Sequence, residues 1–372
     1  MMSLRKAVFV PALAIAFFFQ TLLAGQQPVT QKRMGEFEIL TRAPCLAVLN
    51  QGNTGTCWSF ATMSFMESEV LRILGHPVDL SEMYVVRCAV REKARRYVML
   101  GGKAVFGQGG LSHDVIAMIK RYGILPAESY PGLRKGQKQH DHTEMFTLVK
   151  TVLDKLVETK PSRRSRYWED AVMGIVDSYL GRVPLGVPTK DGVLSPQQYA
   201  NNVLRLPLDD YVEVMSYSYV PFHEKGELLV PDNWLRYDGY LNLPIDEFMA
   251  GMINALEKGY TVAADMDVSE KGFDSRKGVA RLVRFWEERG ITQADRDEMF
   301  RTGSTTDDHL MHVVGLARGP KGGRYFLTKN SWGEKNGPFG GFIFISEAFM
   351  RAKTLAYMVH KDGLPKSRST DN

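Results

Sequence analysis

Residues 51–60 are Gln51-Gly52-Asn53-Thr54-Gly55-Thr56-Cys57-Trp58-Ser59-Phe60, a Gly- and Thr-rich turn that leads into an apolar repeat. After Cys57 the apolar side chains recur every three to four residues: Phe60, Met63, Met66, Val70 and Ile73. This spacing predicts an amphipathic helix from Cys57 to Leu74 that stops at Gly75. Backbone N–H groups and the helix dipole favour an anion at such an N-terminus, so a Cys57 thiolate would be stabilised there.

The pattern changes from helical to strand-like along the chain. A second helix is predicted from Ser112 to Gly123, with Val115, Ile116 and Ile119 facing inward. Residues from about 133 to 240 are irregular, which indicates an insertion of mixed structure. Beyond it the sequence predicts a helix and then short strands, at Ile245–Lys258, Thr261–Met266, Leu310–Leu316, Arg324–Lys329 and Phe342–Ile345. The expected fold is α+β, with a helical N-terminal lobe, an antiparallel β-rich C-terminal lobe and an active site in the cleft between them.

A thiol nucleophile needs a base, a group that orients the base, and donors for the oxyanion. His309 opens a predicted strand, and His312 would lie on the opposite face, so only one of them can face Cys57. Asn330 ends the next strand, where antiparallel pairing would bring it beside His309. Gln51 precedes Cys57 closely enough to supply an oxyanion donor over the same turn.

Four segments together resemble the active-site segments of papain-like cysteine peptidases. Residues 51–60 are similar to the nucleophile segment of that superfamily. The histidine strand, the asparagine motif and the closing strand have counterparts in His309-Leu310-Met311-His312-Val313-Val314-Gly315-Leu316, Asn330-Ser331-Trp332-Gly333 and Gly340-Gly341-Phe342-Ile343. The pattern of Cys followed by distant His and Asn is a recognised signature of papain-type enzymes. The resemblance implies a hydrolase that cleaves peptide bonds through a thioester.

This resemblance assigns a role to each candidate residue. Cys57 would be the nucleophile and His309 the base, largely as a thiolate–imidazolium pair, with Asn330 orienting the imidazole and Gln51 binding the oxyanion. Substrate contacts are implied for Gly109, Gly110, Trp58 and Trp332. No metal or other cofactor is implied. Asp307 and Asp308, directly before the base, either tune it or are solvated turn acids.

Within the superfamily the chain is most similar to the branch of bleomycin hydrolase and bacterial aminopeptidase C, over about residues 37–363. Gly109-Gly110 with Tyr122–Pro126 carries this similarity, as do Leu194–Tyr199 and Leu243–Phe248. Thr54 stands where the papain pattern has a Cys, so the disulfide that this Cys makes must be absent. Only a short polar tail, 366–372, stands where members of the branch carry a C-terminal arm that restricts them to chain ends.

The first prediction is therefore an aminopeptidase of this branch. The alternatives are an endopeptidase of the same mechanism and a non-catalytic secreted homologue that binds peptides. Peptide or protein substrates are the expected partners, and a homo-oligomer is left open. The net charge of +5 over 372 residues argues against a specific nucleic-acid partner.

The N-terminus has the composition of a secretory signal peptide over residues 1–25. Arg5 and Lys6 precede the apolar stretch Ala7–Phe19, and small residues follow. An uncleaved membrane anchor is the alternative, although the stretch is short for a span. The expected product is a secreted or periplasmic peptidase domain, 26–372, with no membrane-spanning segment.

The chain has three cysteines, Cys45, Cys57 and Cys88, and an odd number leaves at least one thiol unpaired. Cys45 and Cys88 are the candidates for any disulfide, because the chemistry requires a free Cys57. The alternative is that all three are reduced, since a free Cys packs as a small hydrophobe.

Overall fold

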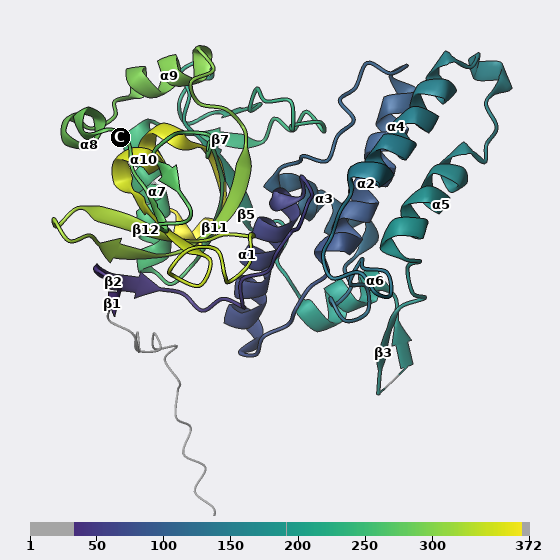
Figure 1. Ribbon diagram of the computed structural model, residues 1–372, viewed down its shortest axis with the longest axis horizontal. Helices are drawn as coiled ribbons and strands as arrows, with labels where there is room; N and C mark the ends of the chain where they lie inside the picture. Colours follow the sequence, from purple (N-terminus) through teal and green to yellow (C-terminus); the bar gives the residue numbers. More distant parts are fainter. Residues whose placement is uncertain (1–32, 191, 367–372) are drawn as a thin grey trace, which may run out of the picture.

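A computed structural model describes residues 33–190 and 192–366 of the chain. The predicted signal peptide, residues 1–25, lies outside the described residues, as does the polar tail after residue 366. Figure 1 shows a helical lobe built from the N-terminal half and a sheet lobe built largely from the C-terminal half. This arrangement confirms the predicted α+β class.

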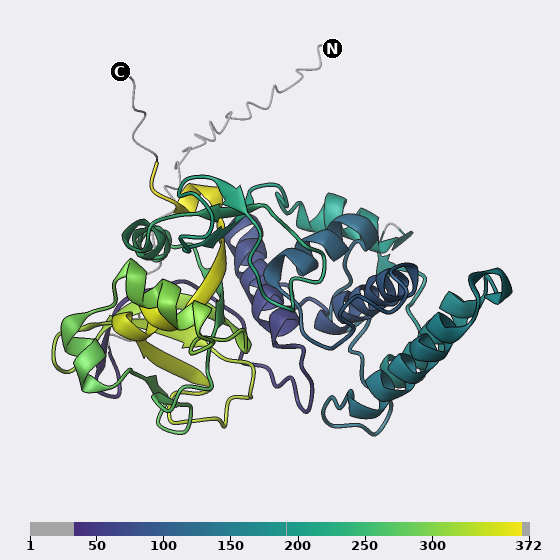
Figure 2. The same ribbon diagram turned by 90° about the horizontal axis from the view of Figure 1, so that it is seen from above.

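The helical lobe contains the following helices: α1 (Cys57–Leu74), α2 (Glu82–Met99), α3 (Ser112–Tyr122), α4 (Thr143–Glu158) and α5 (Trp168–Leu180). In Figure 2, α4 and α5 lie on the side of this lobe that faces away from the sheet. Gly75 ends α1 as predicted, with a φ of 74° and its N–H bonded to the Leu71 carbonyl. A left-handed residue of this kind is a common helix stop, and glycine adopts it without steric cost.

Helix α1 lies at the junction of the two lobes and is buried on all sides over its first 14 residues, Cys57–Val70. The sequence predicted a helix with one apolar face. The structure differs because α1 packs against α2 and α3 on one side and against strands β8 (Val262–Met266) and β11 (His309–Arg318) on the other. A helix enclosed in this way has no solvent-facing side.

Helix α3 has its predicted extent and its predicted inward face, since Val115, Ile116 and Ile119 are buried. Its cap differs from the prediction. Ser112 is the first helical residue rather than the cap, and the Leu111 N–H is bonded by the Asp114 carboxylate at 2.9 Å. A carboxylate in the first turn of a helix satisfies a free N–H and complements the dipole.

The sheet lobe is built around a 12-stranded, mostly antiparallel sheet with the central order β5-β14-β8-β11-β12-β13. Besides β8 and β11, this sheet contains β1 (Arg33–Met34), β2 (Phe37–Arg42), β5 (Tyr211–Met215), β6 (Lys225–Gly226), β7 (Tyr240–Asn242), β9 (Phe273–Asp274), β10 (Val279–Ala280), β12 (Arg324–Lys329), β13 (Phe342–Ser346) and β14 (Thr354–His360). Pairing of β11 with β12 is antiparallel, as predicted for the histidine and asparagine strands. Helices α7 (Ile245–Glu257), α8 (Arg284–Arg289), α9 (Gln293–Arg301) and α10 (Glu347–Lys353) belong to the same lobe.

Residues 133–240, predicted as an insertion, contribute to both lobes. The 3-10 turn η1 (Pro161–Arg163) lies between α4 and α5. After α5 this segment forms the hairpin of β3 (Val187–Thr189) and β4 (Gly192–Leu194), then α6 (Pro196–Gln198) and the π-helical turn η2 (Tyr199–Leu204). Strand β5 then pairs with β14, so the chain is part of the main sheet from residue 211 onward. The remaining 3-10 turn, η3 (Lys361–Gly363), follows β14.

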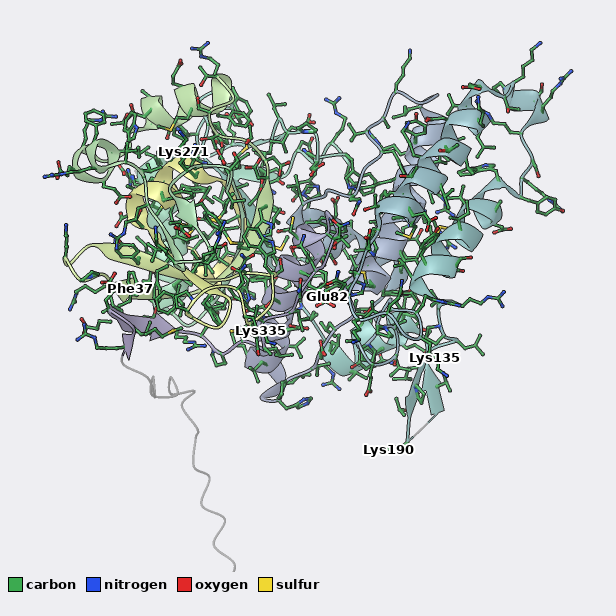
Figure 3. All side chains as sticks on the ribbon, in the orientation of Figure 1. Phe37, Glu82, Lys135, Lys190, Lys271 and Lys335 are labelled. Carbon is green, nitrogen blue, oxygen red and sulfur yellow. The ribbon has the colours of Figure 1, made fainter. Side chains whose placement is uncertain are left out.

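Each lobe has its own apolar core, and the two meet at α1. One core lies among the helices, a second lies between the sheet and α7, and a third small one surrounds Phe37 at the sheet edge. Figure 3 labels Phe37 at this edge and Glu82 on the helical side of the junction. None of the described helices is both long and apolar enough to cross a membrane. Cys45, Cys57 and Cys88 are all free thiols, so no bond joins Cys45 to Cys88.

Candidate active site

Cys57 is the first residue of α1 and is only 9% exposed. The turn before it is held by Thr54, whose hydroxyl donates to the Gln51 carbonyl at 2.9 Å and contacts the Thr56 hydroxyl at 2.6 Å. Thr54 occupies the position where the papain pattern has a disulfide-forming Cys. Its two hydroxyl contacts therefore brace the nucleophile turn without a disulfide.

His309 and Asn330 lie side by side, as the strand pairing predicted. His309 Nε2 donates to Asn330 Oδ1 at 2.8 Å, and the Ser331 N–H donates to the same oxygen at 2.7 Å. The Trp332 ring lies over the imidazole, with centroids 4.8 Å apart. A proton on Nε2 leaves Nδ1 as the imidazole nitrogen that can accept a proton from a thiol.

His312 faces away from this group, which agrees with the predicted strand parity. It is fully buried, and its Nδ1 lies 2.8 Å from the Ser64 hydroxyl on α1. The Lys329 ammonium also donates to Ser64, at 2.8 Å. His312 is therefore held in a structural network behind α1, and His309 is the histidine on the Asn330 side.

Gln51 is tied to the asparagine loop by its backbone and its side chain. Its N–H donates to the Ser331 carbonyl at 2.9 Å, and its Oε1 accepts from the Ser331 hydroxyl at 2.6 Å. Its Nε2 donates to the Thr54 carbonyl at 2.7 Å. These bonds orient the amide, and one N–H of Nε2 is left for a further acceptor. Sequence reasoning missed Ser331 as the residue that orients Gln51.

The surroundings of Cys57 and His309 oppose charge on both side chains. Burial raises the pKa of the Cys57 thiol to about 12, and the carboxylates of Asp265 and Asp307 raise it further. Hydrogen bonds from the Leu310 and Trp58 N–H groups lower the same pKa and so oppose this shift. Burial lowers the pKa of His309 to about 4, and the bond to Asn330 opposes this shift. Both shifts oppose charge on these side chains, whereas the mutual attraction of a thiolate and an imidazolium would favour it, so the ion pair stays a prediction.

Gly109 and Gly110 each make a close approach that a side chain would prevent. A Cβ on Gly109 would overlap the Asp232 carboxylate, and one on Gly110 would come within 3.0 Å of the Trp58 ring. Trp58 is fully buried and donates its indole N–H to the Gln108 carbonyl at 2.9 Å. The Trp58 ring therefore packs against the glycine pair. Substrate contact by Trp58 stays a prediction. Trp332 is half-buried.

Comparisons with known proteins match both halves of the chain. Residues 38–177 match the model of the papain family cysteine proteases, and residues 189–371 match that of the peptidase C1-like family. The chain belongs to the papain family of C1 cysteine peptidases. Within this family it lies in the bleomycin hydrolase and aminopeptidase C branch, as the sequence resemblance implied.

The curated relatives of this papain-family peptidase are distant. Aminopeptidase G from Lactobacillus delbrueckii subsp. lactis is 22% identical, covering 88% of this chain and 84% of the relative. Aminopeptidase C from the same organism is also 22% identical, covering 86% and 80%. Among solved structures, PepW from Lactobacillus rhamnosis matches with a TM-score of 0.69 at 21% identity, covering 88% of this chain and 83% of PepW. This structural match shows the fold.

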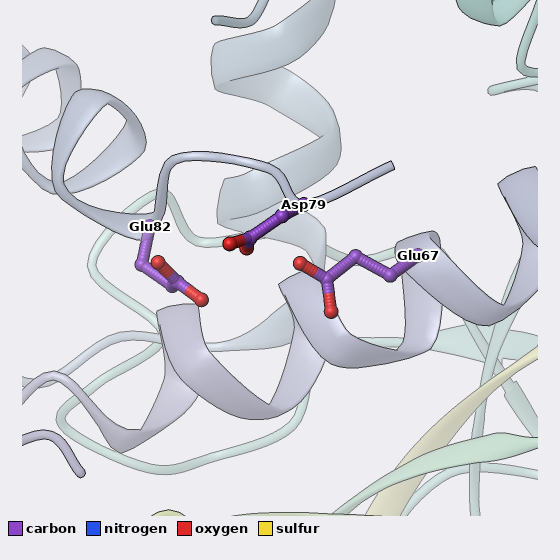
Figure 4. A group of neighbouring side chains, drawn as sticks. All are labelled: Glu67, Asp79 and Glu82. Atoms are coloured by element: carbon purple, nitrogen blue, oxygen red, sulfur yellow. The ribbon is translucent and has the colours of Figure 1, made fainter. Parts of the chain in front are cut away.

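Three carboxylates meet behind the candidate active site. Figure 4 shows Glu67 from α1, Asp79 from the following loop and Glu82 from the start of α2, with their carboxyl groups turned toward one another. Their oxygens lie within 4.8 Å, close enough to hold a metal ion. Burial raises the pKa of both Glu67 and Glu82, and the positive charge of Lys329 opposes this shift. The Leu80 N–H also bonds the Glu67 carboxylate at 3.0 Å. These contacts account for the cluster as a structural one.

We expect the Glu82→Gln variant to show the energetic cost of this cluster. Burial raises the pKa of Glu82 to about 8. The unfolded state therefore loses this proton first as pH rises, and stability falls between the unfolded pKa of about 4.3 and pH 8. The variant should melt at least ~2 °C above the wild type at pH 8 and show no gain at pH 4. Equal melting temperatures at both pH values would contradict this account. Glu158→Gln, on the exposed end of α4, is the control in thermal unfolding.

We expect Gln51→Ala to reduce kcat by about 10²–10³, which is typical for the loss of one oxyanion donor. Ser331→Ala is the matched variant, because it removes the bond to Gln51 Oε1 and keeps the amide donor. The loss of kcat in Ser331→Ala should be smaller than that in Gln51→Ala. Steady-state kinetics on one peptide substrate compares the two, and equal losses would show that Gln51 acts only by bracing the loop.

Proposed function

We propose that this protein is a cysteine aminopeptidase that hydrolyses peptide bonds through a thioester on Cys57. The observation that carries this proposal is that the start of α1, at Cys57, meets the start of β11, at His309. Cys57 begins α1 at the junction of the lobes, and the Leu310 N–H, directly after His309, stabilises its thiolate. The His309–Asn330 bond supports the same reading, because it fixes the imidazole tautomer that a general base needs.

In this mechanism His309 Nδ1 takes the thiol proton as Cys57 Sγ attacks the scissile carbonyl. The Cys57 N–H and Gln51 Nε2 bind the oxyanion. When the tetrahedral intermediate collapses, the C–N bond breaks and His309 gives its proton to the leaving amine. Water, deprotonated by His309, then hydrolyses the thioester and restores the thiol.

The aminopeptidase part of the proposal is supported by the curated relatives, whose names are aminopeptidases G, C and E. The N-terminal composition supports export, and we propose that the mature enzyme acts in the periplasm or outside the cell. Amino acids and short peptides released from extracellular protein would be its products.

Cleavage of paired substrates tests the proposal. Aminoacyl coumarylamides with a free α-amine are compared with their N-acetylated forms at equal concentration. A preference for the free amine of ~10-fold or more supports an aminopeptidase. Equal cleavage would make the protein an endopeptidase of the same mechanism. Cleavage of neither, under conditions that keep the thiol reduced, would favour the non-catalytic peptide-binding homologue.

A further inference from the structure

Carboxylates that the thioester mechanism does not use lie beside Cys57. Asp265 and Asp307 act on the Cys57 thiol through their charges, and Asp232 acts on both of them in the same way. The three acids come from separate parts of the chain. Asp265 lies on β8, Asp307 lies just before β11, and Asp232 lies in the loop between β6 and β7. Three elements thus bring carboxyl groups to one place beside Cys57.

Asp265 is the acid whose position is hardest to explain as a structural one. It is 3% exposed, and its carboxyl group interacts with the Asp307 carboxyl group but has no other hydrogen-bond partner among the described residues. Two acids in such contact share a proton, so the pair carries about one negative charge. The strand position of Asp265 is directly opposite Leu310, the residue after His309. A buried carboxylate without a partner costs several kcal/mol or takes up a proton. The pKa of Asp265 is accordingly raised far above its usual value by burial and by Asp307.

Asp232 brings the loop before β7 onto the glycine pair. Its carboxylate packs directly on Gly109, and the nearby Trp234 donates its indole N–H to Asp114 at 2.7 Å. Gly109 and Gly110 are the residues for which the family resemblance implies substrate contact. The loop of residues 228–238 therefore places a carboxylate on the surface expected to hold the residues at the amino end of the substrate.

Positive charge at this place falls short of the negative charge. The acids that act on one another here are Asp114, Glu213, Asp232, Asp265 and Asp307. The Lys93 ammonium faces Asp114 and Asp232 and donates to the carbonyls of Gly107 and Gly109. His113 lies between Asp114 and Glu213, at 3.5 and 3.6 Å. Neither cation is paired with Asp265 or Asp307, so the part of the cluster next to Cys57 lacks a counter-ion.

We propose that Asp265 and Asp307, with Asp232, form a subsite that binds an ammonium group of the substrate next to Cys57. This inference rests on the proposed peptidase function and specifies its substrates. The ammonium is either the free α-amine of the chain end or the side chain of a lysine at the same subsite. A bound cation also removes the negative field that opposes the Cys57 thiolate, so the correct substrate promotes ionisation of its own nucleophile.

Substrate selectivity of the double variant Asp265→Asn/Asp307→Asn tests the proposal. The substrates are free and N-acetylated peptides, and N-acetylated peptides with lysine or norleucine before the scissile residue. A charge-assisted bond contributes about 1.5–3 kcal/mol, so the ratio of kcat/KM for charged over uncharged substrates should fall by roughly 10–100-fold. A fall for free peptides alone assigns the α-amine, and a fall for lysine peptides alone assigns the side chain. An unchanged ratio would overturn the subsite.

Two further variants separate folding and general charge effects from the subsite. Asp232→Asn removes the half-buried member of the set and should lower the same ratio, which keeps the test open if the double variant does not fold. Asp274→Asn removes an equal charge from the sheet lobe, where Asp274 pairs with exposed Lys277 at 3.0 Å. It should leave the ratio at the wild-type value.

A labelling experiment distinguishes failure of the subsite from failure of the proposed function. Cationic and anionic methanethiosulfonates modify thiols without any catalytic turnover, and peptide mass spectrometry assigns the label to Cys57. The cationic reagent should react at least ~10-fold faster than the anionic one, and the double variant should lose most of this difference. If no peptide is cleaved but this difference appears, the ammonium subsite stands and the peptidase falls. Equal rates in the wild type would overturn the subsite, even in an active enzyme.

Discussion

Replacing Cys57 by alanine should lower kcat/KM for peptide hydrolysis by ~10⁴-fold or more, because no other group can form the acyl intermediate. The change removes one sulfur atom at the start of α1, so we expect the fold to be retained. Cys45→Ala is the matched control, since Cys45 is also a free thiol but does not lie in the candidate site. The control should keep wild-type activity.

Rates of both variants on a free aminoacyl coumarylamide, with circular dichroism to verify folding, make this comparison. A Cys57→Ala protein that stays folded and keeps full activity would remove the thioester mechanism. A loss in Cys45→Ala as large as in Cys57→Ala would instead show that the thiol effect is structural.

Replacing His309 by alanine should have the second largest effect, a loss of kcat of ~10³-fold or more. His309 both takes the thiol proton and supplies the proton for the leaving amine, and each proton transfer contributes about 10²–10⁴-fold. Burial favours the neutral thiol, and without the imidazole the attack loses the group that takes the thiol proton and delivers it to the leaving amine. Added imidazole should restore part of the rate.

His312→Ala is the informative contrast, since the two histidines share one strand and are equally buried. It removes the contact with Ser64 and opens a cavity behind α1. We expect a lower melting temperature and a nearly normal rate per folded molecule. If His312→Ala lost the rate and His309→Ala lost only stability, the assignment of the base would be reversed.

Local patterns in the sequence were enough to predict the elements that position the site. The stop of α1 at Gly75, the inward face of α3 and the opposite orientations of His309 and His312 depend on residues a few positions apart. The burial of α1 on all sides from Cys57 to Val70 could not be read in this way, because its second partner is the sheet formed largely from residue 211 onward. Strand β5 likewise pairs with β14, which lies about 140 residues later in the chain.

The electrostatics of the site were the least predictable part. An ion pair was expected from the helix N-terminus and the family resemblance, both of which favour a thiolate. The charges that oppose the thiolate come from Asp265 and Asp307, which belong to separate parts of the chain. One signal was visible: Asp265 interrupts the otherwise apolar run Val262–Met266, and an acid inside a buried strand usually has a partner or a function.

The most direct test of Cys57 as the nucleophile is titration with a thiol-directed epoxide, with the site of labelling located by peptide mass spectrometry. We predict one label per molecule, on Cys57 alone, with activity lost in proportion to labelling and with slower labelling in His309→Ala. Full peptidase activity after complete labelling of Cys57, or loss of activity that follows labelling of Cys45 or Cys88, would contradict the account.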